Sequence, residues 1–176
     1  MAPWPGKPRT IEFFKVVQNK LLWAISEQTA AELIYRRVDA TLPLLGMQSF
    51  AKSGDHPIRK GDLSIAKNYL NENEIKLLGL LVEQYLAFAE TMAQQRTPMH
   101  MKDWIVRLDA IIQLNGRELL SHAGKISHQT ALKKSAQEYA KYREVRGQIQ
   151  HEESLLELEQ DIEQLGLTNR GGESDR

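Results

Sequence analysis

The segment from Glu72 to Gln95 constrains the fold more than any other, because its apolar residues form two rows at helical spacing. One row consists of Ile75, Leu78, Val82, Tyr85, Ala89 and Met92, and the second of Leu77, Leu81 and Phe88. A helix that is apolar on two faces must be covered on both sides by neighbouring elements. We therefore expect this helix at the centre of the core, with Asn71 and Glu74 capping its start.

The other periodic segments are also helical, and no segment shows the alternation of a half-buried strand. Helices are expected at residues 10–26, 29–39, 62–70, 97–114, 117–122 and 127–146. The order Thr29-Ala-Ala-Glu32 is that of a capping box, and Ser127 is placed to cap the helix that follows it. The stretch 40–61, rich in glycine and proline, predicts a long loop whose apolar residues pack on the body.

The sequence thus predicts an all-α fold, a multi-helix single domain around the central two-faced apolar helix. Residues 1–9, with three prolines and a glycine, are expected to form an irregular leader, and residues 10–147 the helical domain. A C-terminal tail helix is expected over 148–166, after Gly147, and a disordered tail over 167–176. Apolar residues recur at heptad spacing in this tail helix, at Leu155, Leu158, Ile162 and Leu165.

Composition excludes several classes of protein. Lys+Arg 23 balances Asp+Glu 23 over the 176 residues, so no net charge draws the chain to nucleic acid or anionic lipid. The absence of cysteine excludes disulfides, thiolate catalysis and cysteine-based metal sites. The first residues do not form a signal peptide, and the longest apolar cluster, LLGLLV, is too short to span a membrane. We expect a cytoplasmic protein with no cofactor and no membrane partner.

The residues that could carry chemistry concentrate between Lys102 and His128. The candidate catalytic residues are His122, Glu118 and Arg117. On a helix, Glu118 would lie one turn before His122, where a carboxylate can orient an imidazole for acid–base work, while Arg117 could stabilise negative charge. No nucleophile or cofactor motif accompanies them. A surface ion pair and a histidine at a helix end explain the same residues without catalysis.

Two other kinds of site can be weighed in this stretch. Lys125 and Ser127 lead into a helix N-terminus whose amides could bind a phosphate or carboxylate. His122 and His128 are separated by six positions and a glycine break, so they would not share one helix face, and we expect no metal site. An ordinary helix junction, with Ser127 as the cap, is the alternative to anion binding.

Polar residues on two other helices complete the candidate set. Glu32 and Arg36 share a face of the second helix, and Asp103 and Arg107 share a face of the helix that carries Trp104. If these faces met in a cleft they would form a polar network; otherwise each is a solvated surface with weak ion pairs. The candidate ligand-binding residues are therefore Lys125, Ser127, His128, Glu32, Arg36, Asp103 and Arg107.

Charge is distributed unevenly near the C-terminus. Residues 125–146 contain six basic side chains against Glu138 and Glu144, and eight acidic side chains follow from His151 to the end. A basic helix with two tyrosines could lie against nucleic acid, although acidic residues interrupt it and the surrounding elements of a recognition motif are missing. The two stretches could equally neutralise each other.

Four strings resemble a known family: FFKVVQNKLLWAI (13–25), TAAELIYRRVDA (29–40), RKGDLSIAKNYLNENE (59–74) and MKDWIVRLDAIIQLNGRELLSHAGKISH (101–128). In this order, over about residues 11–146, they resemble the C-terminal half of the RhuM family of bacterial virulence-associated proteins. The resemblance implies a bacterial protein linked with pathogenicity islands and mobile elements. It implies no catalytic residues, because no biochemical activity is established for the family.

The resemblance also has departures. Family members carry a preceding half that looks like a helix-turn-helix or winged DNA-binding segment. The leader MAPWPGKPR does not resemble what would precede FFKVVQNK, so we expect a truncated member. Leu22 stands where the family pattern suggests a histidine, and Ser26-Glu27 replaces a His-Gly-like pair. Any role of those family residues would be lost in this chain.

Three functional hypotheses follow from the sequence. The first is a non-enzymatic interaction, effector or regulatory module that binds a protein partner, or a second copy of itself, through helix faces. The second is an enzyme that acts on a phosphate-containing substrate with His122 as acid or base. The third is a DNA-associated regulator, or a truncated copy without function.

Overall fold

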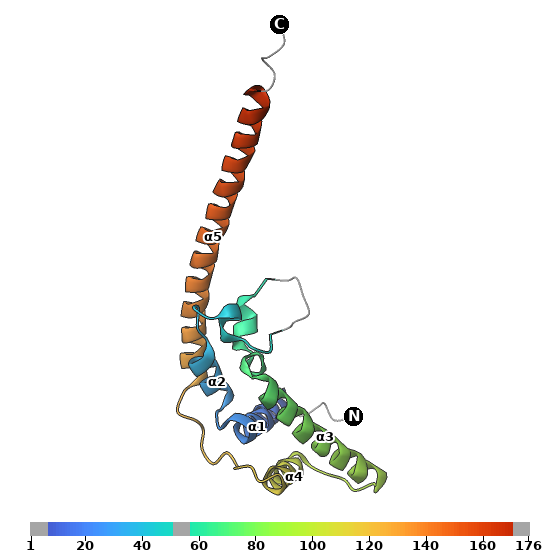
Figure 1. Ribbon diagram of the computed structural model, residues 1–176. Helices are drawn as coiled ribbons and strands as arrows, with labels where there is room; N and C mark the ends of the chain where they lie inside the picture. The colour runs from blue at the N-terminus through green and yellow to red at the C-terminus, as the bar shows by residue number, and fades with distance from the viewer. Residues whose placement is uncertain (1–6, 51–56, 171–176) are drawn as a thin grey trace.

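The computed structural model of the chain describes residues 7–50 and 57–170 (Figure 1). Five α-helices and three short 3₁₀ helices form in these ranges, and no strand occurs within them. The α-helices are α1 (Lys7–Ser26), α2 (Ala30–Arg37), α3 (Glu72–Gln94), α4 (Met101–Leu114) and α5 (His128–Arg170), and the 3₁₀ helices are η1 (Pro43–Gly46), η2 (Lys60–Ser64) and η3 (Ala66–Tyr69). The predicted all-α class is confirmed.

Helix α2 is the most enclosed element of the core. It contacts α1, η3 and the beginning of α5, and its apolar residues Leu33 and Ile34 are no more than 1% exposed. The predicted capping box starts this helix: Thr29 Oγ1 accepts from the Glu32 amide at 3.3 Å, and Glu32 Oε2 accepts from the Thr29 amide at 2.9 Å. Local hydrogen bonds therefore fix where α2 begins, and burial of its apolar face fixes where it packs.

Helix α3 does not take the central position that its two apolar rows predict. It packs on α1 and on α4, but Leu81 is its one buried residue, and Leu80 and Leu86 are exposed. In Figure 1, α3 runs away from α2 along the edge of the body. Periodicity identifies the faces that a helix can bury, whereas the competition among elements for the core decides which faces it does bury.

The segment between α2 and α3 is buried in the core instead. A long loop was predicted here, over residues 40–61. Its described part folds into η1, η2 and η3, and the expected helix over 62–70 is two 3₁₀ helices instead. Tyr69 is buried there and donates a hydrogen bond to the Leu63 carbonyl at 2.9 Å; this burial raises the pKa of Tyr69. Several other apolar side chains of the segment are also buried, namely Leu45, Met47, Phe50, Ile58, Leu63 and Leu70.

Helix α5 is continuous, so the predicted division at Gly147 into a domain helix and a tail helix is wrong. Glycine in a helix costs about 1 kcal/mol relative to alanine, and the strong helix formers on both sides of Gly147 outweigh that cost. The helix includes residues 167–170, which were expected to be disordered; residues 171–176 lie outside the described residues. In Figure 1, the second half of α5 extends beyond the body.

Three further boundaries differ from the expectation, and one of them is that α4 begins at Met101 and not at residue 97. Helix α1 already begins at Lys7, within the expected leader; residues 1–6 lie outside the described residues. Pro8 is tolerated in the first turn because the amide that a proline lacks would have no hydrogen-bond partner there. The expected helix over 117–122 does not form, and residues 117–127 cross from α4 to α5 as irregular chain. An isolated segment of six residues is too short to offset the cost of helix nucleation.

Candidate functional site

A groove lies between α1, the start of α2 and residues 120–128. It consists of two adjoining hollows, of about 300 Å³ and about 540 Å³, which share Lys15, Asn19, Thr29 and Ala123 as lining residues. Ser127 and His128 line the first hollow, and His122 lines the second. The groove therefore brings three of the predicted site residues to one place.

Sequence reasoning did not identify the contribution of α1 to this groove. Lys15 lines both hollows and carries a positive charge, and Asn19 Oδ1 accepts a hydrogen bond from the Ala30 amide at 2.9 Å. Both residues lie on a helix with ordinary amphipathic spacing, so nothing in their local sequence distinguishes them from a solvated helix face. Only the packing of α1 against residues 120–128 gives them a place in the groove.

Glu32 is a buried carboxylate that joins the start of α2 to residue 125 beside the groove. Its side chain is 2% exposed, and its Oε1 accepts from the Lys125 amide at 2.7 Å while Oε2 accepts from the Thr29 amide. Burial acts to raise the pKa of Glu32, but hydrogen bonds from the Lys125 and Thr29 amides and the charge of Arg36 together lower it. Glu32, predicted as a ligand-binding candidate, is thus occupied by the backbone that it anchors.

Gly124 allows this close approach of residues 123–126 to α2. Its φ is +86°, in the left-handed region, and a Cβ at this position would lie 2.9 Å from both Thr29 Oγ1 and Thr29 Cγ2. A larger residue would therefore be strained by its backbone and would collide with the cap of α2. Gly124 and Glu32 act together, because the glycine lets the chain come near and the carboxylate then binds the next amide.

His122 lies in the groove without its predicted partner. Its ring meets Trp23 edge-on, with centroids 4.7 Å apart, and its Nδ1 accepts from the Gly124 amide at 3.0 Å. Glu118 is exposed and makes no hydrogen bond or ion pair within the described part of the chain. The expected pairing required a helix over 117–122, which does not form, so the catalytic role of His122 stays a prediction.

The other candidates are dispersed. Arg117 lines a separate hollow beside α3 with Leu81 and Asn115. Asp103 caps the start of α4 by accepting from the His100 amide at 2.9 Å, and the guanidinium of Arg107 lies 5.8 Å from the centroid of the Phe88 ring.

Two ligand-binding candidates beside the groove have different surroundings. Arg36 is exposed on α2, and its positive charge helps to lower the pKa of Glu32. Ser127 fulfils its predicted cap, since its Oγ accepts from the Thr130 amide at 3.1 Å.

Neither Asp103 nor Arg107 lines the groove, and the faces of α2 and α4 do not form one polar network.

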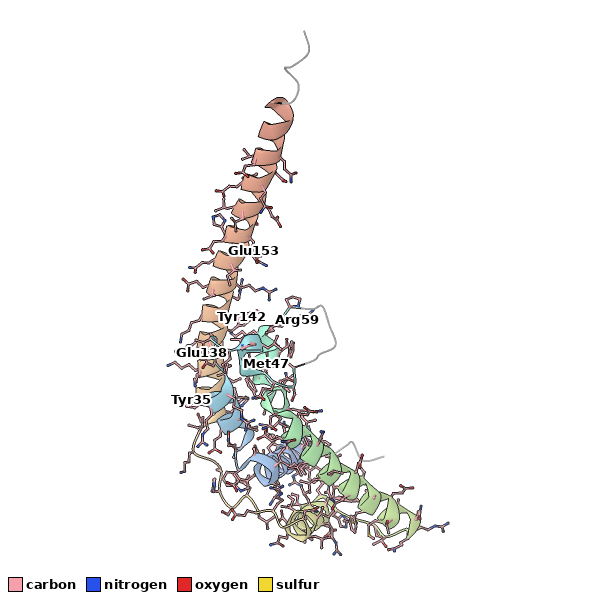
Figure 2. All side chains as sticks on the ribbon, viewed as in Figure 1. Tyr35, Met47, Arg59, Glu138, Tyr142 and Glu153 are labelled. Carbon is pink, nitrogen blue, oxygen red and sulfur yellow. The ribbon has the colours of Figure 1, made fainter. Side chains whose placement is uncertain are left out.

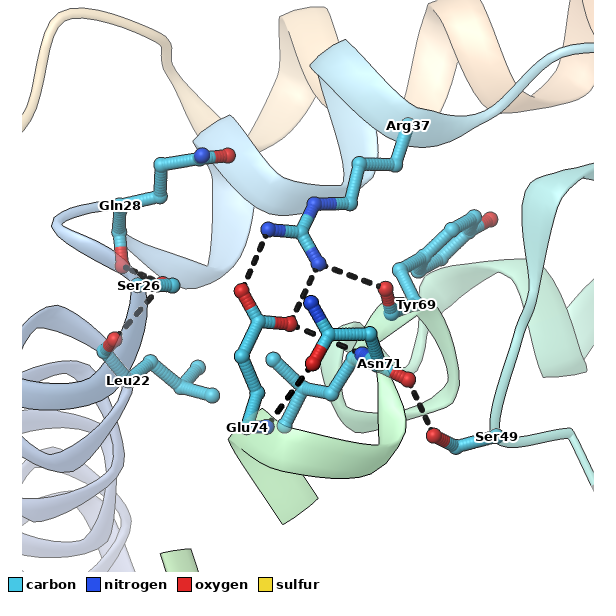
Figure 3. A network of polar contacts seen from close by, with 9 residues as sticks. Leu22, Ser26, Gln28, Arg37, Ser49, Tyr69, Asn71 and Glu74 are labelled. Atoms are coloured by element: carbon cyan, nitrogen blue, oxygen red, sulfur yellow. Dashed lines mark hydrogen bonds and ion pairs between the residues drawn. The ribbon is translucent and has the colours of Figure 1, made fainter. Parts of the chain in front are cut away.

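A half-buried ion pair that the sequence did not predict joins α2 to α3. Figure 3 shows Arg37 donating through Nη1 and Nη2 to the two carboxylate oxygens of Glu74, at 2.6 and 2.7 Å, and through Nη1 to the Tyr69 carbonyl. Glu74 also accepts from the Asn71 amide at 2.8 Å, which completes the predicted capping box of α3. Because both carboxylate oxygens of Glu74 are bound by Arg37 and the same side chain caps α3, we assign the cluster a structural role.

The first part of α5, residues 128–142, is fastened to the body by polar contacts as well as apolar ones. Glu138 Oε2 accepts from the Ala40 amide at 2.9 Å, and Lys134 Nζ donates to the Tyr35 carbonyl at 2.5 Å. In Figure 2, Tyr35, Glu138 and Tyr142 lie where α5 meets the body, and Glu153 lies beyond it. We refer to residues 128–142 as the anchored half of α5.

We refer to the following residues, 143–164, as the projecting half. Every residue in this range is exposed. The large apolar side chains among them are Val145, Ile149, Leu155, Leu156, Leu158 and Ile162. Six acidic residues and no lysine or arginine occur from Gly147 to Gln164. A helix with this many exposed apolar side chains is typical of an interaction surface.

Three kinds of comparison bear on these features. A family comparison matches residues 5–150 to the Virulence protein RhuM family, which is more than half of the chain. No curated protein and no solved structure matches the chain.

No helix in the described ranges combines the length and apolar character that a membrane span requires. Among the same residues, no three histidine, cysteine or acidic side chains cluster as metal ligands.

Proposed function

We propose, starting from the fact that this chain belongs to the Virulence protein RhuM family, that it is a non-enzymatic interaction module. The body around α2 holds the anchored half of α5, and the projecting half binds another protein chain. The module acts by association, so its effect in virulence depends on what α5 contacts.

The observation that carries this proposal is the exposure of the whole projecting half. An isolated helix in water is marginal unless its apolar face is covered. Burying a single leucine side chain stabilises a complex by about 1.5–3 kcal/mol, and this half presents six large apolar side chains. Charged residues separate them, which is the pattern of a helix that binds a partner helix.

The state of the groove also supports binding over catalysis. A general acid–base pair needs its two groups within hydrogen-bond reach, and Glu118 does not contact His122 within the described residues. The buried carboxylate nearest to the groove, Glu32, has both oxygens engaged by backbone amides. What remains in the groove is a set of polar side chains in which, among the described residues, no serine hydroxyl is hydrogen-bonded to a histidine or a carboxylate.

Site-specific photocrosslinking in bacteria tests the proposal. A photoreactive phenylalanine analogue replaces Leu158 on the projecting half, with Glu83 on the exposed face of α3 as the matched control. We expect a protein adduct from position 158, including an adduct with a second copy, and none from position 83. The same probe at Ile149, Leu155 and Ile162 extends the scan. Failure of all four projecting positions to yield a protein adduct would overturn the proposed function.

Anion binding in the groove is a second candidate, favoured by the grouping of Lys15, Ser127 and His128 around one hollow beside the start of α5. A helix N-terminus with a nearby cation is suited to phosphate. Titration with inorganic phosphate should shift the amide NMR signals of His128 and nearby residues in the wild type and not in Lys15→Ala. Equal shifts in both proteins, or no shifts in the wild type, would exclude this groove as the binding site.

A further inference from the structure

The projecting half continues one particular face of α5, and this face has a defined position relative to the body. At about 3.6 residues per turn, the buried residues Ala131 and Ser135 share a side of the helix with Tyr142, which packs on the core. The opposite side, which we call the outer face, carries small residues in and just after the anchored half and large apolar residues further on. The small and apolar residues of the outer face are Ala136, Ala140, Gly147, Leu155, Leu158 and Ile162, and the polar residues Lys133, Gln137, Glu144 and His151 lie on the same side.

The charges flanking the outer face change sign along the helix. Lys133, Lys141 and Arg143 are exposed toward the anchored end, where Glu144 is the one exposed acidic residue among residues 128–147, and Glu159 and Asp161 are exposed near the tip. Two copies of α5 in parallel would place acidic residues against acidic residues, which destabilises a helix pair. Two antiparallel copies would place the acidic tip of each helix against the basic base of the other, which favours association.

We propose that the outer face of α5 binds the α5 helix of a second copy of this chain in antiparallel orientation, centred on His151. This inference rests on the proposed function and names the partner of the projecting half. With this centre, Leu155 of each copy meets Gly147 of the other, and Ile162 meets Ala140. These two large side chains then pack onto small ones in both halves of the interface, which lets the helices approach closely there, while Leu158 of each copy meets Glu144 of the other.

The same register pairs the flanking charges. Lys141 and Glu159 are eighteen positions apart, as are Arg143 and Asp161. Eighteen residues correspond to about five helical turns, so the members of each pair lie on the same flank of the outer face. Residues on the same flank face each other across an antiparallel helix pair. Glu159 of one copy therefore meets Lys141 of the other, Asp161 meets Arg143, and two-fold symmetry repeats both contacts.

Continuity of α5 through Gly147 makes this interface long enough. A tail helix beginning after Gly147 would offer about two heptads, whereas the overlap of residues 138–164 with their symmetry mates is nearly four heptads, the length expected of a stable helix pair. The body packs on the opposite side of α5, as Figure 1 shows for the single chain, so the two bodies point away from each other. Apart from the half-buried Ala136, the residues of the outer face are exposed.

Sedimentation velocity on the full chain gives the first test, with two leucines of nearly equal exposure as test and control. Leu158, on the outer face, is 56% exposed, and Leu156, on the side that continues the body contact, is 57% exposed. We expect a dimer for the wild type, a dissociation constant at least about tenfold weaker for Leu158→Glu, and little change for Leu156→Glu. A wild-type chain that stays monomeric at about 100 µM, or equal weakening by both variants, would overturn the proposal.

Charge reversal and cysteine crosslinking test the orientation. Arg143→Glu and Asp161→Lys should each weaken the dimer, and the double variant should regain most of the lost affinity. Since the chain has no cysteine, His151→Cys should form an intermolecular disulfide under mild oxidation, because the centre of an antiparallel pair brings it next to its symmetry mate. Gln137→Cys is the control, because it would meet its own mate only in a parallel pair.

Efficient crosslinking at position 137 together with failure of the charge-reversed double variant would refute the antiparallel pair. These outcomes also separate the two proposals. A monomer whose projecting half still crosslinks to a different protein in bacteria contradicts the self-pairing and leaves the proposed function standing. Absence of any adduct contradicts both.

Discussion

The anchored and projecting halves of α5 belong to one uninterrupted helix, yet their side chains have opposite surroundings. In the anchored half, Ala131 and Ser135 are buried against α2 and its neighbours, and Glu138 accepts a hydrogen bond from the Ala40 amide. In the projecting half every residue from 143 to 164 is exposed. The same backbone geometry therefore serves the domain core at one end and leaves every side chain exposed at the other. Secondary structure alone does not distinguish these two surroundings.

The largest loss of stability should come from truncating a core leucine next to the anchored half. Leu33, on α2, is fully buried next to the anchored half, and Leu33→Ala should lower the free energy of unfolding by about 2–5 kcal/mol. Leu156→Ala, on the projecting half, should change it by less than about 0.5 kcal/mol. Urea denaturation followed by circular dichroism measures both values. Similar losses for the two variants would contradict the division of α5 into two halves.

Removal of the Glu32 charge should have the next largest effect. In Glu32→Gln, the amide NH₂ cannot accept a hydrogen bond, so either the Thr29 or the Lys125 amide loses its partner, at a cost of about 1–3 kcal/mol. Glu157→Gln, in the exposed projecting half, should leave the free energy of unfolding unchanged within error. The comparison uses the same urea titration, and a neutral Glu32→Gln would show that residues 123–126 do not depend on this carboxylate.

The pH dependence of stability sharpens the same point. Glu32 and Glu138 have pKa values lowered in the folded protein from an unfolded reference of 4.5. Because the folded pKa lies below the unfolded one, both carboxylates stabilise the fold above pH 4.5, and this contribution is lost as the pH falls further. The free energy of unfolding of Glu32→Gln should therefore fall less steeply below pH 4.5 than that of the wild type. Parallel curves would exclude Glu32 from the acid response.

The smallest effects should come from two glycines, and with opposite signs. Gly124→Ala strains a left-handed backbone and collides with Thr29, so it should destabilise by about 1 kcal/mol or more. Gly147 lies in a helix with open space around the position. Gly147→Ala should therefore stabilise α5 by up to about 1 kcal/mol. Thermal melts of both variants test the pair. Destabilisation by Gly147→Ala would indicate that the glycine breaks or bends α5 after all.

Local chemistry explains the parts of the fold that could be predicted. The capping boxes of Thr29 with Glu32 and of Asn71 with Glu74 form as expected, and so does the cap by Ser127. Each is a bond between residues three positions apart, so a short piece of sequence contains all its partners. The failures at 117–122 and at Gly147 concern weak signals, where a few tenths of a kcal/mol separate helix from coil.

The candidate site was predictable only in part for the same reason. His122, Ser127 and His128 do line one groove, but Lys15 and Asn19 join them from α1, more than ninety positions earlier in the chain. Glu118 and Arg117 were grouped with His122 on the assumption of a helix, and irregular chain separates them from it. A site assembled from distant segments cannot be deduced from spacing within one of them.

The sequence by itself determined the all-α class, the family and the positions where most helices begin, since periodicity and caps are recorded in neighbouring residues. Tertiary structure decided that α2 and not α3 is enclosed by the core, that Glu32 binds the Lys125 amide across ninety-three positions, and that half of α5 is left uncovered. These outcomes depend on which apolar faces displace the most water when all segments compete for one core. That competition is settled between segments that are far apart in the chain.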